Sequence, residues 1–186
     1  MGVTAGNGAS AEYKRIAALS ARELAAIFAR GERPDIESMV GWIYRGANTH
    51  VVAKAAGIGK FVKGFYRDAA AEEARGYNIP VIPDALDRPW QLQPSPAAPK
   101  RFGFYRVAPV DATAPDNAHL HAILLDYGAV PGKILDPVRT LRDYLVRVEA
   151  GSDELLLGRA FARVGPAAIP LSWFLLERLA PTDFAG

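Results

Sequence analysis

The last third of the chain, residues 139–179, constrains the fold more than any other stretch. It contains three apolar-rich runs, at residues 141–149, 154–164 and 169–179. They are separated by two short turn-forming segments, Ala-Gly-Ser-Asp at 150–153 and Gly-Pro-Ala-Ala at 165–168. Runs of this length between such segments are typical of β-strands joined by tight turns. Connections this short cannot make the crossover that parallel strands require, so the pattern predicts an antiparallel meander.

Five further segments have the length and composition of strands, at residues 41–48, 60–67, 76–82, 101–110 and 119–127. Eight strands in sequence, mostly with short connections, predict a mainly β fold. The expected architecture is an up-and-down antiparallel barrel of about eight strands, lipocalin-like, with short N-terminal helices. Such a barrel has room inside for packed side chains or one small ligand. The alternative is a strongly bent sheet wrapped on the N-terminal helices, as in an α+β roll.

The expected helices lie before the first strand. Ser20 followed by Glu23 is a capping box, which predicts a helix that starts there and stops at Gly31. A shorter helix is expected from near Ser10, and residues 34–39 are expected to add one helical turn that begins at a proline. Helices this short cannot bury their apolar faces alone, so they are expected to dock on the sheet.

Two connecting segments are long enough to carry function. Residues 49–57 predict a short helical lid, and residues 83–99, with five prolines, predict a long irregular loop. Residues 1–10 are small and polar and are expected to be disordered. Residues 11–186 are expected to form a single domain.

Composition and charge exclude several classes of function. The net charge of +2, without a concentrated basic stripe, is too small for a dedicated nucleic-acid-binding protein. The chain has no cysteine, which fits a reducing compartment. We find no apolar run long enough for a signal peptide or a transmembrane helix, so we expect a cytoplasmic protein with no membrane span. Walker A, Rossmann, GxSxG and HExxH motifs are also missing.

One segment resembles a known small domain. Met-Val-Gly-Trp-Ile-Tyr-Arg-Gly at 39–46, followed by Gly-Lys-Phe at 59–61, is similar to the opening of the bacterial GXWXG-type domain. The resemblance covers roughly residues 20–66, and it departs from the motif because Tyr44 stands in place of the tryptophan and Trp42 in place of the first glycine. The strand count also resembles that of lipocalin-like (calycin) barrels. Both resemblances imply a barrel that holds an apolar ligand, and neither implies a catalytic residue.

Aromatic strands with embedded cations are the main candidates for a binding site. Residues 60–67 place Lys63 on the same strand face as Phe65, and residues 101–110 place Arg106 on the same face as Phe104. A cavity of aromatic rings with one cation could hold the carboxylate or phosphate of an amphipathic ligand. The alternative is that these cations lie outside, in solvent. The predicted ligand-binding residues are Lys63, Phe65, Phe104, Arg106, His121, Tyr127, Arg159, Phe161 and Trp173.

Enzymatic and metal-binding interpretations have weaker support. His119 and His121 would share one face of a strand and could bind a metal, but further ligands are not evident. Asp126, Tyr127 and His121 could serve as an acid–base set, although Asp126 and His121 have opposite strand parity. The alternative for Asp126 is a structural ion pair with an arginine. We therefore predict no catalytic residue, no metal and no cofactor.

The prediction for function is a binding protein for a small apolar or amphipathic, lipid-like ligand inside a β-barrel cavity. Two alternatives remain open: a small-barrel enzyme of the isomerase or dehydratase type, and a structural or interaction domain whose barrel is filled by its own side chains. The filled barrel would expose an apolar patch at the last strand or at the N-terminal helices. A homodimer is also left open by the sequence.

Overall fold

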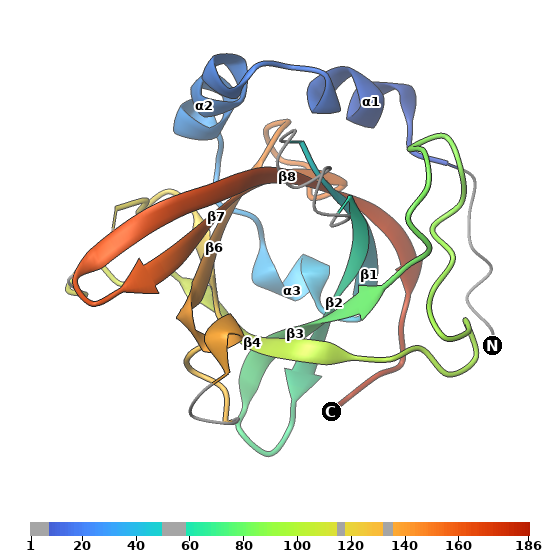
Figure 1. Cartoon of the computed structure of the whole chain (residues 1–186). Coiled ribbons are helices and arrows are strands. Elements are labelled where there is room, and N and C mark those ends of the chain that lie inside the picture. Colours follow the sequence, from blue (N-terminus) through green and yellow to red (C-terminus); the bar gives the residue numbers. More distant parts are fainter. Residues whose placement is uncertain (1–7, 50–58, 115–117, 132–135) are drawn as a thin grey trace.

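The computed structural model of the chain describes residues 8–49, 59–114, 118–131 and 136–186. It shows a closed barrel of eight antiparallel strands in sequential order, β1 pairing with β8 to complete the ring (Figure 1). The predicted fold class is therefore confirmed. The strands are β1 (Trp42–Asn48), β2 (Lys60–Asp68), β3 (Glu73–Pro80), β4 (Phe102–Pro109), β5 (Ile123–Asp126), β6 (Leu141–Arg147), β7 (Leu155–Val164) and β8 (Ala167–Pro181).

Both faces of the barrel wall bury apolar side chains, so the molecule has two cores. One core fills part of the interior and includes Phe65, Tyr105 and Leu176. The other lies outside the wall, beneath the N-terminal helices and the long loop, and includes Tyr77 and Trp173. Successive strand residues point to opposite faces, so neighbours such as Trp173 and Phe174 belong to different cores. This is why β8 is apolar on both faces between Trp173 and Leu176.

Two N-terminal helices cover the outer wall. The helices α1 (Ala11–Ala17) and α2 (Ala21–Arg30) begin at serine N-caps, and Ser20 forms the predicted capping box with Glu23. Tyr13 of α1 is fully buried, and its hydroxyl donates to the carbonyl of Leu175 on β8. Phe28 of α2 packs edge-on against Trp173, with ring centroids 5.5 Å apart. The helices therefore cover the apolar outer face of β8 and its neighbours (Figure 1).

A short helix closes one end of the barrel. Helix α3 (Ile36–Met39) is capped by Asp35 and inserts the fully buried Met39 into the inner core. In Figure 1, α3 is visible through the ring of strands. Asp153, before β7, accepts hydrogen bonds from the Ser38 hydroxyl and from the Arg147 guanidinium, the latter at 2.6 and 2.9 Å. These contacts anchor α3 to the β6–β7 connection.

The proline-rich loop between β3 and β4 is packed on the outer wall. Its Trp90 is 1% exposed, and its indole Nε1 donates to the Gly46 carbonyl at 3.1 Å. The ammonium of Lys60 lies 3.8 Å from the centroid of the same ring and donates to the carbonyl of Ala85 at 3.1 Å. The loop thus covers the outer face of β1 and β2 rather than the interior. The predicted lid at 49–57 lies outside the described residues, apart from Thr49.

Several boundaries differ from the sequence prediction. Helix α3 begins at Ile36, after its cap Asp35, rather than at the proline at 34. Strand β3 begins at Glu73 because it pairs with β2 from the first residue after a tight turn. Strand β5 begins only at Ile123, since His119–Ala122 forms a turn closed by a backbone hydrogen bond of 3.0 Å. The hairpin of β7 and β8 is longer than expected and projects from the barrel, with Ile169 and Leu171 exposed near its tip (Figure 1).

In the described part of the chain, no helix has the length and apolar character needed to cross a membrane.

Candidate functional site

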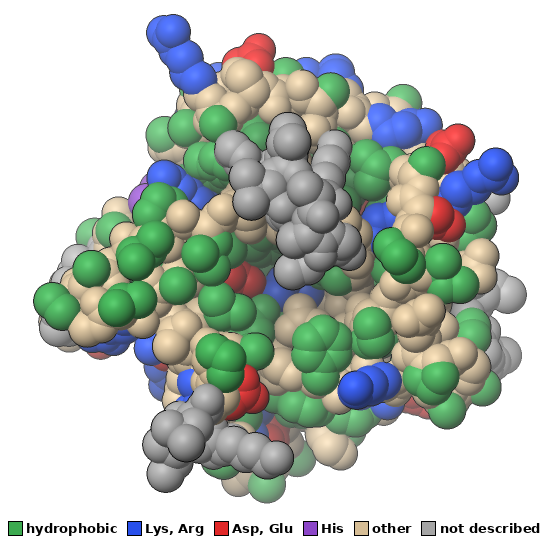
Figure 2. All heavy atoms as spheres, viewed as in Figure 1, with side chains coloured by type: hydrophobic (Ala, Val, Ile, Leu, Met, Phe, Trp, Pro, Cys, Tyr) green, Lys and Arg blue, Asp and Glu red, His purple; other side chains and the backbone are tan. Residues whose placement is uncertain are grey.

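A cavity of about 530 Å³ lies inside the barrel at the end opposite α3. Figure 2 shows the molecule hollowed at this opening, with acidic and basic side-chain atoms visible within. The wall is mainly apolar and aromatic, which is typical of sites for small organic ligands. The cavity is lined by Asn48, Phe61, Lys63, Asn78, Phe102, Tyr127, Val138, Leu141, Asp143, Ala160, Leu171, Ser172 and Phe174.

Four polar side chains form a network on the cavity wall. The Lys63 ammonium donates to Asn78 Oδ1 at 2.9 Å and to the Tyr127 hydroxyl at 2.5 Å, and lies 3.2 Å from Asp143 Oδ2. The Tyr127 hydroxyl donates to Asp143 Oδ2, also at 3.2 Å. The side chains of Lys63 and Asp143 are only 4% and 6% exposed. A buried charge is tolerated when it is paired and hydrogen-bonded in this way.

The strand register brings these residues together. Lys63 on β2 is the direct partner of Asn78 on β3, and Asp143 on β6 is the partner of Leu125 on β5, two residues before Tyr127. The Asn78 amide nitrogen donates to the Gly103 carbonyl at 3.0 Å. Gly103 has a φ of 54°, a left-handed conformation that glycine adopts without strain. A bulge in β3–β4 pairing occurs at the same place and turns the Gly103 carbonyl toward the network.

Burial sets the protonation behaviour of the network. Burial lowers the pKa of Lys63, and the neighbouring carboxylate of Asp143 opposes this shift. Burial also raises the pKa of the Tyr127 hydroxyl well above its usual value, and the negative charge of Asp143 raises it further. Aromatic rings surround the ammonium, with the centroids of Tyr105 and Phe174 at 4.8 and 5.5 Å. The rings partly replace the lost hydration through cation–π attraction.

Three of the nine predicted ligand-binding residues lie on the inner face. Lys63 and Tyr127 line the cavity, and Phe65 lies deeper, in the packed part of the interior. Lys63 and Phe65 are two residues apart on β2, and Tyr127 comes two residues after the inward-pointing Leu125 of β5. This spacing is what the alternation of side chains along a strand requires.

The other six predicted residues lie on the outer face or in turns and do not line this cavity. Phe104 and Trp173 belong to the outer core, and the Arg159 guanidinium lies 4.8 Å from the Trp173 ring. His121 precedes β5, and its Nε2 is hydrogen-bonded to the Phe28 carbonyl of α2 at 3.0 Å. The reason is parity: each of the strand residues sits one position away from an inward-pointing neighbour. The six residues are Phe104, Arg106, His121, Arg159, Phe161 and Trp173.

The alternative acid–base set does not converge. Asp126 pairs on the outer face with Arg142, at 2.6 Å, which is the structural ion pair that the sequence left open. Tyr127 points inward, whereas His121 packs against α2 outside the barrel. Among the described residues, no group of three or more histidine, aspartate or glutamate side chains is placed to hold a metal ion.

Sequence reasoning missed half of the polar network. Asp143 is not among the predicted site residues, although it alternates with the apolar residues Leu141 and Leu145. A single acid on an otherwise apolar strand face is the signal that could have identified it. Asn78 gave no such signal, because its role depends on the register between β2 and β3.

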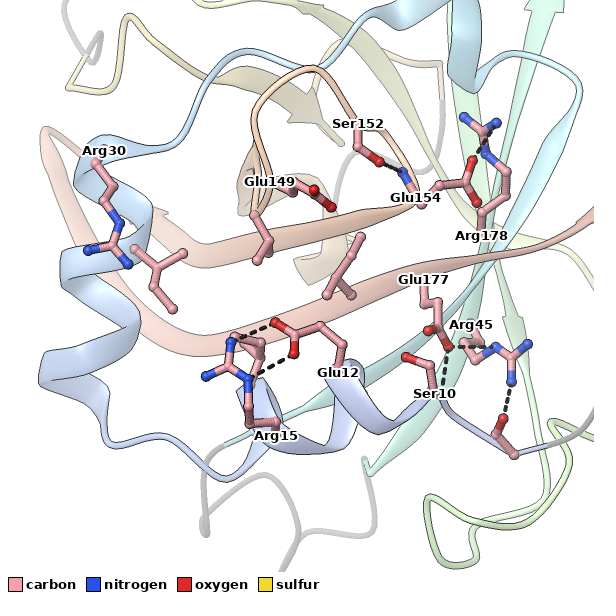
Figure 3. Close-up of a pocket in the computed structure, with 15 residues that line it drawn as sticks. Ser10, Glu12, Arg15, Arg30, Arg45, Glu149, Ser152, Glu154, Glu177 and Arg178 are labelled. Atoms are coloured by element: carbon pink, nitrogen blue, oxygen red, sulfur yellow. Dashed lines mark hydrogen bonds and ion pairs between the residues drawn. The ribbon is translucent and has the colours of Figure 1, made fainter.

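A second hollow, of about 750 Å³, lies between α1, α2 and the outer wall. Its charged lining consists of four arginines and four glutamates among the described residues, and several are paired (Figure 3). Arg15 pairs with Glu12 at 2.6 Å, and Arg178 pairs with Glu154 at 2.9 Å. These opposite charges neutralise one another, so this groove offers less basis for recognising a ligand than the barrel interior.

Comparisons with protein-family models, with curated proteins and with solved structures found no match.

Proposed function

We propose that the protein binds a small apolar or amphipathic molecule in the open end of its barrel. The observation that carries the proposal is a mainly apolar cavity of about 530 Å³ with one polar network on its wall. Sites for small molecules have volumes of roughly 300–1,000 Å³ and combine apolar walls with a few convergent polar groups. The rings of Phe61, Phe102 and Phe174 would contact the apolar part of the ligand.

The uneven filling of the barrel supports this proposal. The end near α3 is packed by fully buried side chains, among them Tyr44, Leu145 and Leu156. Packing at that end supplies stability, so the opposite end can stay hollow without loss of the fold. Ala160 of β7, the strand partner of Asp143, contributes a small side chain to the cavity wall. A larger side chain there would fill the space that we assign to the ligand.

The test is a fluorescence titration with N-phenyl-1-naphthylamine, an apolar probe that brightens when it leaves water. Wild-type protein is expected to bind the probe saturably with one-to-one stoichiometry, and Ala160→Trp is expected to abolish binding. Ala69→Trp is the matched control, since Ala69 is exposed in the turn between β2 and β3. Circular dichroism establishes that both variants are folded. Equal binding by wild type and a folded Ala160→Trp variant would contradict the proposal.

A further inference from the structure

The two oxygens of the buried Asp143 carboxylate have unequal surroundings. Oδ2 lies 3.2 Å from the Lys63 ammonium and accepts a hydrogen bond from Tyr127. Oδ1 has no hydrogen-bond partner among the residues that the structure describes, although the side chain is only 6% exposed and lines the cavity. Oδ1 is not one of the fully buried polar atoms without a partner, so it is accessible from the cavity and can accept a hydrogen bond from a ligand there.

The cation of the network is engaged by three partners within the network. An ammonium group has three N–H donors. Lys63 donates hydrogen bonds to Asn78 Oδ1 and to the Tyr127 hydroxyl, and its ammonium forms an ion pair with Asp143 Oδ2 at 3.2 Å. The hydroxyl proton of Tyr127 is used by Asp143, and the Asn78 amide nitrogen is 3.0 Å from the Gly103 carbonyl and 3.4 Å from the Tyr127 oxygen. The network therefore presents an acceptor to the cavity rather than a free cation.

We infer that the cavity takes an uncharged amphipathic ligand whose polar end donates a hydrogen bond, such as a hydroxyl or amide N–H, to Asp143 Oδ1. This inference rests on the proposed function. A carboxylate or phosphate end would meet the like charge of Asp143, and an ammonium end would meet the charge of Lys63. This assignment differs from the expectation from sequence that a cation in the cavity holds a carboxylate or phosphate.

The inference is tested by displacing N-phenyl-1-naphthylamine from wild-type protein with four ligands of equal chain length. These are 1-decanol, its methyl ether 1-methoxydecane, decanoate and decylamine. 1-Decanol is expected to bind about 10-fold or more tightly than each of the other three, because only it supplies an uncharged donor to a charged acceptor. Equal affinity for the alcohol and its ether would overturn the inference.

The variant Asp143→Asn addresses the acceptor itself. It is expected to reduce the preference for 1-decanol over decanoate to within a few-fold, since the repelling charge is gone. Asp183→Asn is the matched control, because Asp183 is exposed and its replacement changes the net charge equally. An unchanged preference in a folded Asp143→Asn variant would contradict the assignment. If that variant does not fold, the four ligands on wild-type protein decide the question. Absence of saturable probe binding would instead overturn the proposed function.

Discussion

A double-mutant cycle on Lys63 and Asp143 measures how strongly the buried pair is coupled. Replacing Lys63 with Met leaves the Asp143 charge inside the barrel with Tyr127 as its remaining donor. Replacing Asp143 with Leu leaves the Lys63 ammonium without its counter-charge. Because both side chains are at least nine-tenths buried, each single change is expected to lower the free energy of unfolding by about 3–5 kcal/mol.

The double variant is expected to behave differently from the sum of the two. With both charges gone and apolar side chains in their place, its stability should lie close to that of wild type, since apolar replacement of a buried pair is often neutral. Urea unfolding followed by circular dichroism gives the four free energies. The coupling free energy should reach several kcal/mol. Costs that add, or single costs below about 1 kcal/mol, would show that the pair is hydrated like a surface ion pair and would refute the reasoning.

Three further predictions concern the framework around the site. Burial of Asp153 raises its pKa, but the hydrogen bonds from Arg147 and Ser38 and the positive charge of Arg147 together outweigh burial, so the net shift of the pKa is downward. The stability from Asp153 is therefore present above its unfolded pKa and lost as pH falls through the folded one. Asp153→Asn should flatten the acid limb of a stability–pH curve, and an unchanged acid limb would contradict this. Ser20→Ala removes the N-cap of α2 and should lower the free energy of unfolding in urea by about 1 kcal/mol. An unchanged free energy of unfolding would indicate that packing alone holds the helix. Gly158→Val places a Cβ 2.1 Å from the Phe174 ring and should cost about 1–3 kcal/mol, and an undiminished melting temperature would show that the ring can move aside.

The strand order could be read from the sequence because turns and alternation are local signals. The segments at 150–153 and 165–168 are too short for the crossover that parallel strands need, so the strands on either side of each must pair antiparallel. The capping box at Ser20 marks the start of α2. The boundaries of β3 and β5 were less predictable, because they depend on where a neighbouring strand begins to pair.

Which face of each strand points into the barrel could not be predicted as well as the strand order. Lys63 and Trp173 each belong to a strand with apolar residues on both faces, since the outer wall is covered by α1, α2 and the loop at 81–100. Where both faces are apolar, composition does not distinguish the inside of a barrel from the outside. Long-range register decided that Lys63 points inward and Trp173 outward.

The most direct test of a ligand site inside the barrel is a set of intermolecular proton nuclear Overhauser effects between bound 1-decanol and the protein. We expect cross-peaks from the alkyl chain to the rings of Phe61 and Phe174, which face the cavity. Cross-peaks confined to exposed residues of the β7–β8 hairpin, such as Val164 and Ile169, would place the molecule on the outside and contradict the account.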